Sequence, residues 1–295
     1  MPEDNHILSY YQKISDGSIA AGRWIHLLYE YLVNGIEKKS FIFDQKKADA
    51  AINWIETHCF HTEGPLAPGP LSLELWQKAM ISAIFGIVDE DGNRRFREVL
   101  LLVSRKNGKS LLASAIANYI WRVDGGYGAK VYCCAPKLDQ ADIVYNNIWQ
   151  MVTLDPDWQE RHELCKELDR HERKKNDDSM LEKHRQSDLS ISGTNSTVKT
   201  IAFSAKKSDG FNPHLSVCDE IAAWPGEGGI RQYEVMTSAL GSREQPMIFS
   251  ITTANYISGG IYDDLYKRAT SFLQGNSREK RLLPFLYQID NVEKW

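Results

Sequence analysis

The stretch that decides the fold is EVLLLVSRKNGKSLLASAIAN, residues 98–118. Its first part, 99–103, is a continuous apolar run, which is typical of a strand buried on both faces. After the Gly-Lys-Ser at 108–110, apolar residues recur at every fourth position from Leu112 to Ile120, the spacing of one helix face. The sequence therefore predicts a strand, a tight loop and a helix in succession.

The loop between this strand and helix has the chemistry of a phosphate-binding site. Gly108 lets the backbone turn its N–H groups toward phosphate oxygens, Lys109 reaches the terminal phosphates, and the Ser110 hydroxyl can hold a magnesium ion. The usual loop has a glycine five positions before Gly108, where this chain has Val103, so its first turn is atypical. A Gly-Lys-Ser tripeptide is also common in exposed turns, and here the flanking strand and helix favour the phosphate loop.

Length and composition allow one large α/β domain with appendages, or two modest domains. The chain has 295 residues, 42% of them hydrophobic, and a formal net charge of −4. This charge argues against a broadly basic surface, so any nucleic-acid contact must be a local patch or be shared among subunits. We expect no membrane span and no export signal, because no window approaches the roughly 20 apolar residues needed. The cysteines predict core thiols in a reducing cytoplasm.

Residues 1–63 predict an N-terminal helical region without chemistry of its own. Apolar periodicity predicts two helices between residues 5 and 33, with the second ended by Asn34 and Gly35, and a third helix over 44–58. His58 lies at the end of that third helix, where we expect a solvated imidazole rather than a zinc ligand.

Residues 64–70 contain three prolines and two glycines and predict a linker. Ser72 then has the chemistry of a helix cap, and the helix that follows carries Trp76 and Gln77. A Trp-Gln pair shortly before a phosphate loop suits adenine, because an aromatic ring can stack on the base and an amide offers it a donor and an acceptor. The alternative is a packed tryptophan beside a surface glutamine.

Further strands and helices alternate after the phosphate-loop helix. Residues 130–135 predict a strand and 138–152 a helix, and short strands are predicted around 189–191 and 198–203. This alternation predicts a mainly parallel sheet flanked by helices. Residues 157–185 are highly charged with both signs interleaved, which indicates a solvated helix or mobile excursion.

The second decisive stretch is residues 215–220, a short apolar strand that ends in Asp219 and Glu220. An ATPase needs such an acidic pair opposite its phosphate loop. Asp219 would hold the magnesium ion across from Ser110, and Glu220 would polarise the attacking water. Acidic pairs are common on surfaces, so the hypothesis depends on the combination with Lys109 and Ser110.

The rest of the chain predicts a loop at 225–229, a helix at 230–240, a buried strand at 246–254, a helix at 261–273 and a strand-like run at 281–289. The strand at 246–254 ends in Thr252, Thr253 and Ala254. Their hydroxyls could sense the γ-phosphate through Glu220 or water, or the threonines could serve as plain strand formers.

The chain resembles a known family, the ATPase domain of the large terminase subunit of tailed bacteriophages. The motifs that carry the resemblance span nearly the whole chain: Leu75 to Gln77, Val103 to Ser110, Ala135 to Ala141, Ser204 to Pro213, Leu215 to Glu220, and Gln245 and Pro246 leading to Thr252 to Ala254. The missing first glycine at Val103 and the presence of Arg105 in the loop are what the terminase variant has.

The resemblance implies an additional-strand (RecA-like) P-loop NTPase fold that binds ATP and Mg²⁺. It implies that Gln77 reads adenine, that Arg105 touches the phosphates in cis together with Lys109, and that Glu220 is the catalytic base. Thr252, Thr253 and Ala254 would form the coupling motif. The remaining expected ATP-binding residues are Trp76, Ser104, Lys106, Asn107, Gly108 and Leu111.

The resemblance to terminases also implies that a neighbouring subunit supplies a basic residue to the active site in trans. Lys206, Lys207 and Arg243 are the candidates here, and solvated lysines are the alternative for the first two. The implied partners are double-stranded DNA, the portal protein of the procapsid and the small terminase subunit. The implied assembly is a homo-oligomeric ring, with a monomer as the alternative in isolation. Its place would be the cytoplasm of the bacterial host, transiently docked on the procapsid.

These features predict an ATPase motor that moves double-stranded viral DNA into a procapsid. We expect an ATPase core over 64–280 and, at 281–295, the start of a linker toward a nuclease domain that this chain lacks, so DNA cleavage is not expected. The alternatives are another nucleic-acid-dependent ATPase or helicase-like protein, and a non-enzymatic nucleotide-binding or assembly module.

Overall fold

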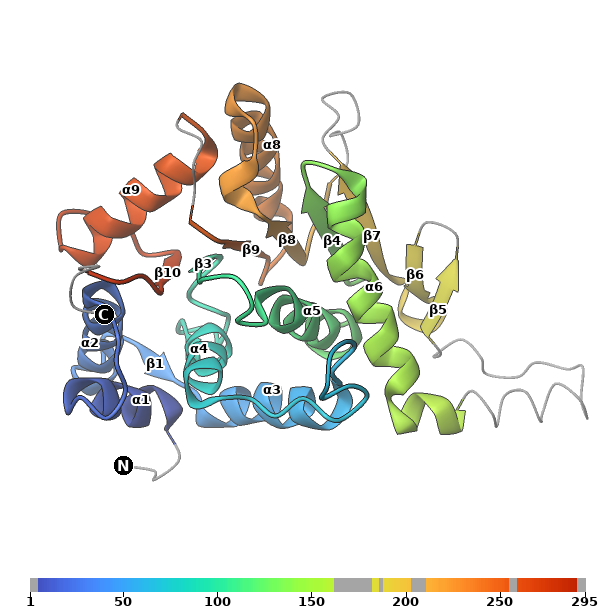
Figure 1. Cartoon of the computed structure of the whole chain (residues 1–295), viewed down its shortest axis with the longest axis horizontal. Coiled ribbons are helices and arrows are strands. Elements are labelled where there is room, and N and C mark those ends of the chain that lie inside the picture. Colours follow the sequence, from blue (N-terminus) through green and yellow to red (C-terminus); the bar gives the residue numbers. More distant parts are fainter. Residues whose placement is uncertain (1–4, 162–181, 186–187, 203–210, 255–258, 291–295) are drawn as a thin grey trace, which may run out of the picture.

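A central β-sheet organises the protein (Figure 1). The computed structural model describes residues 5–161, 182–185, 188–202, 211–254 and 259–290. Among them, eight strands form the sheet in the order β10-β3-β9-β8-β4-β7-β6-β5. The six strands from β10 to β7 are parallel, and β6 and β5 add an antiparallel edge.

The strands of this sheet are β3 (Glu98–Leu102), β4 (Lys130–Ala135), β5 (Glu182–Arg185), β6 (Asp188–Ile191), β7 (Ser196–Ala202), β8 (Leu215–Asp219), β9 (Met247–Thr252) and β10 (Leu282–Leu286). A separate antiparallel pair joins β1 (Ile42–Phe43) to β2 (Ile87–Val88). Every residue of β8, β9 and β10 is buried, as their apolar sequences require for strands covered on both faces.

The helices are α1 (His6–Ser15), α2 (Arg23–Glu37), α3 (Gln45–His58), α4 (Leu75–Gly86), α5 (Lys109–Tyr119), α6 (Leu138–Leu154), α8 (Gly226–Ala239) and α9 (Ile261–Leu273). In Figure 1, α8 and α9 lie on one side of the sheet and α4 and α5 on the other. Among the described residues, none of the helices has the length and apolar character that crossing a bilayer requires.

Strand β9 lies between β3, which leads into the phosphate loop, and β8, which ends in Asp219. Leu102 pairs with Thr252, and Asp219 pairs with Ile251, so all three strands end together at one edge of the sheet. In open α/β sheets this carboxyl edge is where ligands bind. The inserted strand is the mark of an additional-strand (RecA-like) P-loop NTPase, and the predicted fold class is confirmed.

The N-terminal helices are present as predicted, but α2 does not end at Asn34 and Gly35. It continues to Glu37, and Gly35 is buried within it. A β-carbon at Gly35 would lie 2.0 Å from the Phe41 ring, so the glycine is there for close packing and not for a turn.

Three further boundaries differ from the prediction. The helix α4 begins at Leu75 with Glu74 as its N-cap, so the cap is not Ser72. The residues predicted as a loop at 225–229 instead form the first turn of α8, where the Gly229 N–H donates to the Pro225 carbonyl at 2.7 Å. Within the charged stretch, residues 182–185 form the edge strand β5, while 162–181 lie outside the described residues.

The last strand belongs to the central sheet. Strand β10 pairs in parallel with β3 over its whole length, from Leu282 beside Glu98 to Leu286 beside Leu102. The sheet that carries the phosphate loop therefore extends to residue 286, six residues beyond the core boundary predicted at residue 280.

Candidate active site

The phosphate loop connects β3 to α5 at the carboxyl edge of the sheet. Lys106 and Gly108 both have left-handed backbone conformations, with φ of 67° and 68°. The Asn107 side chain braces the loop from inside, since its amide donates to the Ser104 carbonyl at 3.1 Å and to the Ser104 hydroxyl at 2.7 Å. Residues 104–108 are exposed, so the loop faces solvent at the N-terminus of α5, where anions are favoured.

Lys109 lies between the two acidic residues that end β8. Its ammonium is 2.6 Å from Glu220 Oε1 and 3.6 Å from Asp219 Oδ1. Strands β3 and β8 bring these residues together although they are about 110 positions apart in sequence. The side chains of Lys109 and Asp219 are 14% and 6% exposed, so this pairing is only weakly screened by water.

Ser110 and Asp219 provide a donor set that fits a magnesium ion. The Ser110 hydroxyl is 3.4 Å from Asp219 Oδ2. A hydroxyl and a carboxylate are the oxygen ligands that Mg²⁺ prefers, and such a site normally leaves the remaining positions to phosphate oxygens and water. Burial raises the pKa of the Asp219 carboxyl, and the neighbouring Lys109 ammonium opposes that rise.

Glu220 has an unusual backbone. Its φ of 46° and ψ of 49° lie in the left-handed region, which is strained for a residue with a side chain. A 3-10 turn, Ile221–Ala223, follows it directly. The Trp224 indole donates to the Asp219 carbonyl at 2.9 Å, and the Thr252 hydroxyl accepts from the Ala222 N–H at 3.2 Å.

The predicted coupling residues lie beside this acidic turn. Thr252 ends β9 and is buried, and its hydroxyl accepts the Ala222 N–H bond. The Thr253 hydroxyl is 3.5 Å from Glu220 Oε2.

A cavity of about 780 Å³ opens directly beside the phosphate loop. It is lined by aromatic rings, by loop residues and by the end of the coupling motif: Tyr10, Trp76, Tyr262 and Tyr287, then Val103, Ser104 and Asn107, and Ala254. Residues 19–22 and 287–289 complete its wall, and their part could not be anticipated because they come from the two ends of the chain. An apolar, aromatic-lined cavity next to phosphate donors suits a nucleoside.

Gln77 has a structural partner that sequence reasoning missed. Its side-chain Oε1 accepts the backbone N–H of Glu74 at 2.8 Å, so it caps the N-terminus of α4. Trp76 lines the 780 Å³ cavity, where its ring meets Tyr287 at a centroid distance of 5.2 Å, whereas Gln77 does not line it.

Some predicted residues lie outside this cluster. Leu111 is half-buried in the first turn of α5, and the exposed side chain of Arg105 stands in the phosphate loop. Lys206 and Lys207 lie outside the described residues. Arg243 lies after α8 at the opposite edge of the sheet, where its guanidinium donates to the Gly128 carbonyl at 3.0 Å and to Asn212 Oδ1 at 2.5 Å.

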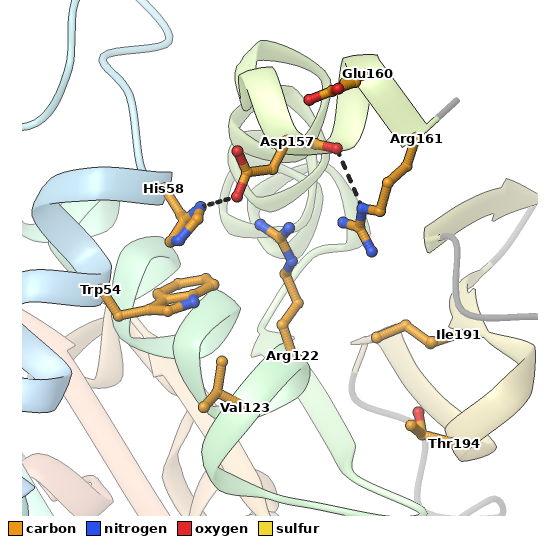
Figure 2. A pocket seen from close by; sticks show the side chains of 9 residues that line it. All are labelled: Trp54, His58, Arg122, Val123, Asp157, Glu160, Arg161, Ile191 and Thr194. Atoms are coloured by element: carbon orange, nitrogen blue, oxygen red, sulfur yellow. Dashed lines mark hydrogen bonds and ion pairs between the residues drawn. The ribbon is translucent and has the colours of Figure 1, made fainter. Parts of the chain in front are cut away.

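A second cavity, of about 390 Å³, lies at the other end of α5 (Figure 2). In it, His58 is 3.2 Å from Asp155 and 3.9 Å from Asp157, so the predicted solvated imidazole is wrong. These three groups could hold a cation, but Arg122 already donates to Asp155 Oδ2 at 2.8 Å. Because its fixed positive charge neutralises that carboxylate, we assign no ligand to this cavity.

Comparison with known proteins identifies the family of this chain. Residues 75–271 match the family model described as terminase large subunit, ATPase domain. The chain is 26% identical over 210 residues to the large terminase subunit of Enterobacteria phage HK97, which covers 70% of this chain and 36% of that protein. It is 31% identical over 91 residues to Protein YmfN of Escherichia coli strain K12, covering 30% of this chain and 19% of that protein.

The crystal structure of the HK97 bacteriophage large terminase superposes with a TM-score of 0.62 and 21% identity, covering 84% of this chain and 47% of that one. That likeness supports the fold. The chain spans less than half the length of each of these relatives. Because the family model covers residues 75–271, most of the sequence, the chain belongs to the family of terminase large subunit ATPase domains.

Proposed function

We propose that this protein is an ATPase motor that couples ATP hydrolysis to the translocation of double-stranded viral DNA into a procapsid. The observation that carries the proposal is the convergence of Lys109, Ser110, Asp219 and Glu220 at the carboxyl edge of the sheet. Positioning and charge stabilisation supply almost all the catalysis of phosphoryl transfer, and these four residues have the required chemistry.

The phosphates of ATP would lie against the loop at the N-terminus of α5, with the nucleoside in the adjacent 780 Å³ cavity. The base would stack against the aromatic lining, which includes the Trp76 and Tyr287 rings. Ser110 and Asp219 would hold the magnesium ion. When bound, that ion neutralises the charge on the transferring phosphoryl group.

The Lys109 ammonium is paired with Glu220 Oε1 at 2.6 Å. A polyphosphate carries more negative charge than a carboxylate, so it would compete for the Lys109 ammonium and free Glu220. The released carboxylate then accepts a proton from the attacking water. Thr253, 3.5 Å from Glu220, and Thr252 would pass the change to β9 as the coupling motif.

The proposed partners follow from the family: double-stranded DNA, the portal protein of the procapsid and the small terminase subunit, with the subunits in a ring and the host bacterial cytoplasm as the location. Arg105 would touch the phosphates in cis. For the basic residue supplied in trans we favour Lys206 or Lys207 over Arg243, because the Arg243 guanidinium is already bonded within its own subunit.

The test of the ATPase proposal is steady-state phosphate release by wild type, Glu220→Gln and Glu227→Gln. The Glu220→Gln variant should still bind ATP while turnover falls by about 10²-fold or more. Glu227 is exposed on α8, where it pairs at i,i+4 with Arg231, so its variant controls for the loss of one carboxylate. Equal turnover in wild type and Glu220→Gln would overturn the assignment of the base.

A further inference from the structure

Trp224 lies four positions after Glu220, and nothing in the sequence marks it as functional. We propose that Trp224 is a positioning residue, which holds Glu220 in the backbone conformation that aims its carboxylate into the active site. The inference rests on the proposed ATPase function, since it concerns the base of that reaction. It does not give Trp224 any contact with substrate.

Both peptide groups that flank Glu220 are held by hydrogen bonds. On the N-terminal side, the Trp224 indole donates to the Asp219 carbonyl at 2.9 Å, and the Glu220 N–H donates to Asp219 Oδ1 at 2.8 Å. On the C-terminal side, the Glu220 carbonyl accepts the Ala223 N–H at 2.7 Å. With both peptide planes fixed, the direction of the Glu220 side chain from its α-carbon is fixed too.

Such restraint is needed because the left-handed conformation of Glu220 is unfavourable by itself. A non-glycine residue keeps φ and ψ near 46° and 49° only when its surroundings over-determine them. Residues held in this way cluster at active sites, where the strain pre-organises a reacting group. The hydrogen bond from the Trp224 indole to the Asp219 carbonyl supplies such a restraint, because it comes from a large side chain buried in the core.

Trp224 is itself immobilised by its packing. The residue is 1% exposed, and the 3-10 turn that directly precedes it packs against α9. Two glycines allow close packing against Trp224 near its backbone: a β-carbon at Gly229 would lie 2.9 Å from Trp224 Cβ, and one at Gly260 would lie 3.1 Å from the Trp224 carbonyl oxygen. The buried indole is therefore held in one position, from which it donates to the carbonyl of Asp219 at the end of β8.

The experiment compares Trp224→Phe with Trp121→Phe. Both tryptophans are 1% exposed, but the Trp121 Nε1 has no hydrogen-bond partner among the described residues. Both variants lose the same atoms from the core, and only Trp224→Phe loses the bond to Asp219. We expect kcat for ATP hydrolysis to fall by about tenfold or more in Trp224→Phe, with KM and nucleotide affinity within about twofold of wild type.

Trp121→Phe should keep the wild-type kcat even where its melting temperature falls as far as that of Trp224→Phe. A second pair of variants tests the positioning role of Trp224 without changing the indole itself. Gly229→Ala pushes on Trp224, whereas Gly228→Ala, its neighbour in α8, adds a methyl group with nothing within 4 Å. We expect Gly229→Ala to lower kcat and Gly228→Ala to leave it unchanged.

The outcomes separate this inference from the proposed function. An active wild type with unchanged kcat in Trp224→Phe overturns the positioning role and leaves the ATPase proposal standing. An equal fall of kcat in the Trp224 and Trp121 variants also overturns it, because general loosening of the core would then explain the loss. No ATP hydrolysis by wild type at any protein concentration, with or without DNA, contradicts the ATPase proposal itself.

Discussion

His214 lies between two hydrogen-bond donors at the edge of the sheet opposite the phosphate loop. Its Nδ1 accepts the Lys130 backbone N–H at 3.2 Å, and its Nε2 is 3.3 Å from the Arg243 guanidinium. A neutral imidazole has one nitrogen that can accept a hydrogen bond. Protonation would turn that nitrogen into a donor, although the groups that face it are themselves donors. Burial, followed by the charge of Arg243, lowers the pKa of His214 from 6.5 to about 4.

This shift predicts acid sensitivity within a defined pH window. The pKa of His214 is lower in the folded state than in the unfolded state, so protonation favours unfolding. Stability is retained above about pH 6.5 and is lost as the pH falls from there toward about 4. We expect this group to contribute about 1–2 kcal/mol of that loss, reduced by solvent screening.

The measurement for His214 is the free energy of unfolding in urea between pH 7 and 5, for wild type and His214→Gln. Glutamine keeps an acceptor for the Lys130 N–H and does not titrate. The stability difference between the two proteins should shrink as the pH falls. Curves that stay parallel over this range would show that His214 carries no part of the pH dependence.

The four residues that converge at the site could be predicted from the sequence, because each belongs to a local sequence pattern. Lys109 and Ser110 follow an apolar strand in a phosphate-loop order, and Asp219 and Glu220 end another apolar strand. Trp224 could not be predicted, because its role depends on a left-handed turn that side-chain spacing does not reveal. The same holds for the capping bond of Gln77, which competes with base reading and is visible only in three dimensions.

At the scale of elements, two predicted helix boundaries are wrong because a buried glycine lies inside the helix. The sequence predicts a helix end at Gly35 and a loop that includes Gly229, but both glycines lie inside helices. Gly35 leaves room for the Phe41 ring, and Gly229 allows close packing against the Cβ and backbone of Trp224. A glycine used for a turn and one used for close packing are identical in a single sequence, so α2 and α8 were predicted too short.

Helix α2 provides a direct test of this interpretation. In an ordinary helix interior, Gly→Ala stabilises by roughly 1 kcal/mol, because alanine is the better helix former. At Gly35 the added methyl would lie 2.0 Å from the Phe41 ring, so we expect Gly35→Ala to destabilise by about 1–3 kcal/mol instead. Urea unfolding measures the change, and Gly228→Ala, with open space around it, is the control. Stabilisation by both substitutions would refute the packing role.

At the scale of the whole molecule, the N-terminal helices and the sheet share one hydrophobic core. Tyr29 of α2 meets Phe285 of β10 at a centroid distance of 6.3 Å, and Phe41 meets Phe96 at the same distance. Helix α3 packs against α4 on the way to the phosphate-loop helix. The region 1–63 therefore supplies part of the core on which the 64–280 region depends.

This shared core predicts that the two regions unfold together. Far-UV circular dichroism and tryptophan fluorescence should report the same melting temperature, because neither region keeps a complete core without the other. Magnesium and ATP should raise that single temperature in both signals, since a ligand that binds only the folded state stabilises all that unfolds with it. A variant that begins at residue 64 should fail to give a cooperative transition. Two separate transitions, with only the second shifted by nucleotide, would show that the N-terminal helices form an independent domain.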